Sequence, residues 1–173
     1  MVCLQKQKLL LGILLLSVSL TLIAAIASLQ NTGPSSQEND FNLLFRHGVG
    51  AKNELNTFEG TYTKDMVLDP PITISLILSE EELEQIHQKM IEIDFFNYPE
   101  DFPPHPGHVI TPCTNYFIKV EHGSIVKEIN WNTNSMLESN IQDNLWQLAG
   151  CIIDIVEQKP EYKVLPPANG GYI

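Results

Sequence analysis

Hydrophobic and polar positions divide this chain of 173 residues into an apolar opening segment and a patterned remainder. Residues 9–29 contain no charged side chain, and Lys6 and Lys8 precede them. A helix of this length is about 30 Å long, which matches the hydrocarbon core of a bilayer. Its apolar residues surround the whole helix instead of forming one stripe, so we predict a membrane-directed segment and not a helix packed on a globular core.

The length of this segment favours a retained transmembrane anchor, because the apolar region of a signal peptide usually has about 7–15 residues. Cleavage is the alternative, since Ala25-Ile26-Ala27 forms a small-x-small site. The two lysines predict that the amino end stays in the cytoplasm. We therefore expect a single-pass protein of the cell membrane that contacts the bilayer through residues 9–29 and has an extracytoplasmic C-terminal domain, or a secreted protein after cleavage near Ala27.

Three further patterns predict strands. Residues 41–46 form a short apolar run, and residues 57–67 are rich in threonine and aromatic side chains. Residues 72–78 alternate between apolar and polar side chains, as expected for a half-buried strand. Asp69-Pro70-Pro71 is expected to separate the last two strands. Residues 31–40, which lie between the apolar opening segment and the first of these strands, are small and polar and predict a linker.

The sequence from residue 79 to 96 has the pattern of an amphipathic helix with a clear start. Ser79 and Glu82 have the spacing of a capping box, and acidic residues occupy the first turn, where the helix dipole is positive. Asn97-Tyr98-Pro99 is expected to end the helix, because the residue before a proline avoids helical geometry. The residues predicted to face the core are Leu83, Ile86 and Met90.

The second half of the chain predicts a hairpin and a second helix. Residues 115–131 form the hairpin, turning at His122-Gly123 and burying Tyr116, Ile118 and Val120. We expect the helix to be capped by Ser139 with Gln142 and to end at Lys159-Pro160. Its predicted core face consists of Ile141, Leu145, Leu148, Ile152 and Val156.

The predicted order of elements, β-β-β-α-β-β-α, is typical of the α+β class. Strands joined by short turns pair antiparallel, and each amphipathic helix must bury one stripe, so we expect an antiparallel or mixed sheet of about five strands with two amphipathic helices on one face. A transmembrane or signal helix precedes it. The predicted organisation is an anchor or signal peptide over 1–30, a linker over 31–40, one exported domain over 41–165 and an extended tail over 166–173.

Several of these segments resemble a group of small exported or membrane-anchored bacterial proteins of unknown function. The resemblance covers most of residues 58–167 and concerns architecture: strands, a helix that starts Leu-Ser-x-x-Glu-Leu, a hairpin and a final helix. It supplies no catalytic residues. The matching pieces are Leu78-Ser79-Glu80-Glu81-Glu82-Leu83, Phe95-Phe96, the hairpin to Trp131, and Pro160-Glu161-Tyr162 through Leu165-Pro166-Pro167.

Charge narrows the choice of partners. All 21 Asp and Glu residues follow residue 31, where eight of the ten Lys and Arg residues also lie, giving 8 − 21 = −13. Such a surface repels nucleic acids and anionic lipid headgroups, so we expect no nucleic acid partner. Cationic ligands and divalent ions remain compatible with it.

Arg46-His47-Gly48 is a triplet with which histidine phosphatases present their phospho-accepting histidine. That chemistry requires several positive charges around the phosphate, whereas Arg46 is the only arginine of the chain. The phosphatase fold is also a doubly wound sheet, and repeated βαβ units are missing from this pattern. We therefore interpret the triplet as the end of a strand that runs into a glycine-rich turn, and a phosphatase-like enzyme as the remote alternative.

A second candidate is the proline-rich segment 99–113. His105 and His108 could present two imidazoles to one divalent metal ion, with Asp101 and Cys113 as further ligands. Exposed loop histidines often bind nothing, so no cofactor is firmly predicted. Cys113 and Cys151 would also be able to form a disulfide in an oxidising compartment.

These observations favour one function class. No Walker loop, nucleophile elbow, H-E-x-x-H or C-x-x-C motif occurs in the sequence. We expect a non-enzymatic binding or interaction module of the cell envelope whose partner is an envelope protein or a small ligand. The alternative is a metal-binding protein that uses His105 and His108.

Overall fold

Six antiparallel strands form one sheet in the part of the chain that the computed structural model describes, residues 40–107 and 109–173. The strand order is β4-β3-β2-β1-β5-β6, and every neighbouring pair is antiparallel. The strands are β1 (Asn42–Val49), β2 (Asn53–Asn56), β3 (Thr61–Met66), β4 (Asp69–Ser75), β5 (Thr114–His122) and β6 (Ile125–Asn132).

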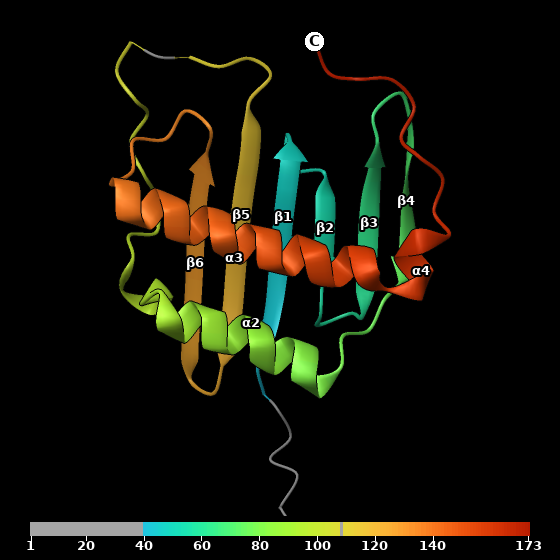
Figure 1. Ribbon diagram of the computed structural model, residues 1–173, viewed down its shortest axis with the longest axis horizontal. Helices are drawn as coiled ribbons and strands as arrows, with labels where there is room; N and C mark the ends of the chain where they lie inside the picture. Colours follow the sequence, from blue (N-terminus) through green and yellow to red (C-terminus); the bar gives the residue numbers. More distant parts are fainter. Residues whose placement is uncertain (1–39, 108) are drawn as a thin grey trace, which may run out of the picture. The chain divides into compact units, whose positions relative to one another are not determined.

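Two long helices, α2 (Glu80–Glu92) and α3 (Ser139–Gln158), cross the same face of this sheet (Figure 1). The 3₁₀ turn η1 (Phe95–Asn97) follows α2, and the short helix α4 (Pro160–Lys163) follows α3. The α+β class, an antiparallel sheet and helices are therefore confirmed. The anchor or signal predicted for residues 1–30 lies outside the described residues. Within the described ranges, no helix is both long and apolar enough to cross a membrane.

Strand β2 was not predicted, and the sheet has six strands instead of about five. Only Leu55 of its four residues is buried, so its apolar pattern is too short to be recognised. The strand predicted over 57–67 begins only at Thr61, because residues 57–60 form the turn between β2 and β3. Gly60 ends this turn with a φ of 64°, a conformation that favours glycine.

The predicted break at Asp69-Pro70-Pro71 is wrong, because these residues lie inside β4. The chain turns earlier, at Val67, which has a φ of 63°. Strand β4 pairs only with β3, so it is an edge strand, where prolines are tolerated. The sequence signal for a turn was therefore the signature of an edge strand.

The start of α2 is as predicted, and its end is not. Ser79 accepts a hydrogen bond from the backbone N–H of Glu82 at 3.3 Å, and the Glu82 carboxylate accepts one from the Ser79 N–H at 2.7 Å. Ile86 and Met90 are buried, with Leu83 packed beside them. The helix ends at Glu92, before the predicted stop, because Asp94 takes up left-handed geometry with a φ of 59°.

The hairpin is confirmed: His122 pairs with Ile125 across a two-residue turn that starts at Gly123. The cap predicted for α3 is wrong, however. Its N-cap residue is Glu138, which makes no side-chain cap hydrogen bond, and Ser139 is already helical. The predicted core face of α3 is correct, because all five of its residues are buried or partly buried against the core.

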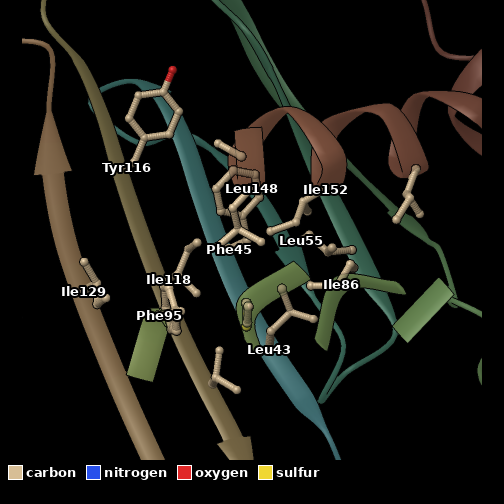
Figure 2. Packing of buried hydrophobic residues seen from close by; sticks show 14 of the residues in the cluster. Leu43, Phe45, Leu55, Ile86, Phe95, Tyr116, Ile118, Ile129, Leu148 and Ile152 are labelled. Carbon is tan, nitrogen blue, oxygen red and sulfur yellow. The ribbon is translucent and has the colours of Figure 1, made fainter. Parts of the chain in front are cut away.

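The hydrophobic core fills the space between the sheet and the helices. In Figure 2, side chains of the central strands meet those of α2 and α3. Four aromatic residues after α2 also belong to this core: Phe95 is fully buried, and Phe96, Tyr98 and Phe102 pack against the cluster. The labelled residues are Leu43, Phe45, Leu55, Ile86, Phe95, Tyr116, Ile118, Ile129, Leu148 and Ile152.

The C-terminal tail has no helix or strand of its own and is bonded to the β3–β4 turn. The backbone N–H of Asn169 donates to the Met66 carbonyl at 3.2 Å, and the Leu68 N–H donates to the Asn169 carbonyl at 3.2 Å. The Tyr172 hydroxyl accepts from Lys52 at 2.9 Å and donates to Asp65 at 2.5 Å. These bonds fix the tail along the sheet.

Candidate ligand-binding site

Three asparagines and one phenylalanine gather on the sheet face that the helices leave uncovered. Along β5 and β6, Asn115, Phe117, Asn130 and Asn132 alternate with residues that face the core. The strand register pairs Phe117 with Asn130 and Asn115 with Asn132. An aromatic ring is therefore surrounded by amide groups on the open face.

A shallow pocket of about 210 Å³ lies at this place. Its rim comes from three separate segments: the β1–β2 turn, the loop after η1 and the connection between β6 and α3. The lining residues are Ala51, Asp101, Phe102, Asn115, Tyr116, Phe117, Asn130, Trp131, Asn132 and Ser135.

The β1–β2 turn holds Ala51 at the rim through an unusual backbone. Gly48, Gly50 and Ala51 have φ angles of 99°, 69° and 53°, and the Ala51 N–H donates to the Gly48 carbonyl at 3.0 Å. An added Cβ at Gly48 would lie 2.8 Å from the Asn53 amide nitrogen, so only glycine fits there. Left-handed geometry at Ala51 costs about 1–2 kcal/mol, and the surrounding turn maintains it.

The loop after η1 is held against β6 by backbone hydrogen bonds. The Asn130 N–H donates to the Glu100 carbonyl at 2.7 Å, and Asp101 bridges to Asn130 in parallel orientation. Further along, the His105 N–H donates to the Asn134 carbonyl at 2.7 Å. This pairing fixes Asp101 at one side of the pocket.

Hydrogen bonds within the protein orient two of the pocket's three asparagine side chains and leave other amide atoms able to bind a ligand. Asn115 donates to the Cys113 carbonyl at 3.2 Å, and the Asn132 side-chain oxygen accepts from the Asn134 N–H at 2.8 Å. This leaves an acceptor on Asn115 and a donor on Asn132, and the Asn130 side chain makes no hydrogen bond within the described part of the chain. Such a mixture of neutral donors and acceptors beside a ring suits a polar, uncharged group.

Arg46 lies next to this pocket, and His47 does not. The Arg46 guanidinium is 5.8 Å from the Phe117 ring centroid and pairs with Glu54 at 2.6 Å. His47 faces the helix side, stacked on Phe45 with ring centroids 5.1 Å apart, and burial lowers the pKa of His47 to about 4. The two side chains point to opposite faces of the sheet, so they do not form one site.

The predicted metal ligands lie around the same end of the sheet. Asp101 lines the pocket, His105 is exposed on the following loop, and the Cys113 thiol accepts a hydrogen bond from Thr133 at 3.4 Å. His108 lies outside the described residues. Among the residues that the structure does describe, no three His, Cys, Asp or Glu side chains are arranged to hold a metal ion. Metal binding stays a prediction.

The disulfide considered from the sequence is not formed in the structure, where Cys113 and Cys151 are both free thiols. Cys113 precedes β5 at the end of the sheet. Cys151 lies on α3 in a polar groove of about 640 Å³ between α2 and α3, where Gln85 donates to its sulfur at 3.8 Å. Burial raises the pKa of the Cys151 thiol, which reduces its reactivity.

The sequence contained a signal for the asparagine pocket that the prediction of the core did not use. Alternation along the hairpin selects Tyr116 for the core, and the same alternation places Asn115 and Phe117 on the opposite face. The turn at His122-Gly123 then fixes the register and brings Asn130 beside Phe117. Comparison with known proteins adds no assignment, since no family model matches the chain and no curated protein is significantly similar to it.

Proposed function

We propose that this protein is a non-enzymatic binding module of the bacterial cell envelope and that the pocket on its open sheet face receives the ligand. Residues 9–29 would anchor it in the membrane, or cleavage near Ala27 would release it. The observation that carries the proposal is the group of Asn115, Asn130 and Asn132 around Phe117. Amide side chains donate and accept hydrogen bonds without titrating, so they hold a ligand and do not exchange protons with it.

Pocket size and charge restrict the ligand. Pockets for drug-sized molecules usually have about 300–1,000 Å³, and this one has about 210 Å³. It therefore suits a small molecule, or one side chain or short loop of an envelope protein. The excess of acidic residues after residue 31 disfavours an anionic ligand.

Nuclear magnetic resonance can test this proposal with a set of small, neutral, polar compounds. We expect at least one compound to shift the side-chain NH₂ signals of Asn115, Asn130 and Asn132. Asn130→Leu should abolish the response, and Ser75→Leu, an exposed position on β4, should preserve it. A response that is equal in both variants, or one confined to other surfaces, would contradict the proposal.

Metal binding is the second candidate, and its support is that hydrogen bonds keep the segments of Asp101, His105 and Cys113 near the connection between β6 and α3. Its test is the metal content of protein purified without a histidine tag. Stoichiometric metal that is lost in the double variant His105→Ala/His108→Ala would support this function. Metal retention that is unaffected by the double substitution would exclude this site.

A further inference from the structure

Two histidines that are distant in the sequence meet where α2 packs on the β5–β6 hairpin. The ring centroids of His87 and His122 are 4.4 Å apart, with an interplanar angle of 69°. His87 also packs on the ring of Phe41, with centroids 4.8 Å apart. The pair therefore connects the helix layer to the sheet beside the segment that leads into β1.

Carboxylates flank both histidines. His122 Nε2 lies 3.3 Å from Asp40 Oδ1, and His87 Nδ1 lies 4.0 Å from Glu84 Oε2. The lysine of β6, Lys127, donates to the Tyr98 carbonyl at 2.6 Å and is not among the charges that act on His87. The side chain of His87 is 13% exposed and that of His122 is 37% exposed, so the two imidazoles have different access to water.

The surroundings of His87 disfavour its protonation. Burial lowers the pKa of His87, and a charge on His122 lowers it further, while Glu84 and Asp40 oppose both effects. A charge on His122 would lie in contact with the His87 ring, because the two ring centroids are 4.4 Å apart. A second proton on His87 would place two like charges in contact at a half-buried site, where their repulsion is poorly screened.

We propose that His87 and His122 form a pH-sensitive link that holds α2 on the sheet while both rings are neutral and weakens when both are protonated. The pKa of His87 in the folded protein lies below that in the unfolded chain. The stabilisation is therefore present at neutral pH and is lost as the pH falls below the ordinary pKa of histidine, about 6.5. The link is separate from the asparagine pocket and does not depend on ligand binding there.

An NMR titration of the imidazoles in the full-length protein between pH 8 and pH 4.5 tests this link. We expect His87 to titrate below the ordinary pKa of histidine, and backbone amide signals of α2 and the hairpin to change with the same midpoint. His122→Gln removes the like charge and should raise the pKa of His87. Asp40→Asn removes an attractive charge and should lower it.

His105→Gln, in the loop after η1, is the matched control and should leave the pKa of His87 unchanged. The proposal is overturned if His122→Gln leaves the pKa of His87 at its original value. It is equally overturned if the amide signals of α2 do not respond to pH. The side chains of His122 and Asp40 are 37% and 59% exposed, so His122→Gln and Asp40→Asn should both preserve the fold.

Discussion

Protonation of His47 should strongly destabilise this fold. His47 lies on β1 on the core side of the sheet, stacked on Phe45 and opposite Tyr116 on β5. Burial lowers the pKa of His47 to about 4, because a charged imidazole would lose its hydration there. In the unfolded chain the same group titrates near 6.5.

The magnitude follows from this difference in pKa. A difference of about 2.5, at about 1.36 kcal/mol for each pKa unit, corresponds to roughly 3 kcal/mol. The folded pKa lies below the unfolded one, so the stabilisation is present above pH 6.5 and is lost as the pH falls toward 4. About 2 kcal/mol should already be lost between pH 7 and pH 5.

Urea unfolding of the full-length protein, followed by the fluorescence of Trp131 and Trp146, measures this loss. His47→Phe keeps an aromatic ring on Phe45 and removes the titration. The free energy of unfolding should therefore fall by about 2 kcal/mol more in the parent than in the variant between pH 7 and pH 5. His105→Gln should behave like the parent. Equal pH dependence in the parent and His47→Phe would refute the reasoning.

Two further predictions concern the backbone, and each has an internal control. Ser79→Ala removes the cap of α2 and should lower the free energy of unfolding by about 1 kcal/mol, whereas Ser139→Ala, which removes no cap, should change urea unfolding by less than about 0.5 kcal/mol. Gly170→Ala should detach the tail, because φ is 87° and an added Cβ would lie 2.8 Å from Leu68. Hydrogen exchange of the Leu68 amide should accelerate in Gly170→Ala. It should not accelerate in Gly171→Ala, where no atom lies within 4 Å of the added Cβ. Equal exchange rates in the two variants would contradict the role of Gly170 in holding the tail.

The elements with long apolar periods could be predicted from the sequence. Helices α2 and α3 and the hairpin each present several core residues at a regular spacing, and these residues are buried or partly buried in the structure. Strand β2 could not be recognised, because only Leu55 marks its buried side. Pro70 and Pro71 indicated a turn because sequence alone does not reveal that β4 is an edge strand.

The candidate sites depend on the order of the strands, which short-range patterns do not encode. Ala51, Asp101 and Asn130 come from three segments that meet only after β1, β5 and β6 have paired. His87 and His122 likewise meet only because α2 packs over the end of the hairpin. Each residue is an ordinary surface or helix position in the sequence, and its neighbours are supplied by the fold.

The two outer strands of the sheet differ in their capacity to recruit another strand. Pro70 and Pro71 are consecutive in β4, so this edge strand lacks two backbone N–H donors. On β6, the Glu100 carbonyl occupies the outward N–H of Asn130, while Ile125 and Val126 remain exposed. Among the described strands, β6 is therefore the edge with more capacity to pair with a neighbour, and two molecules that joined through it would form a closed pair instead of growing into a fibre.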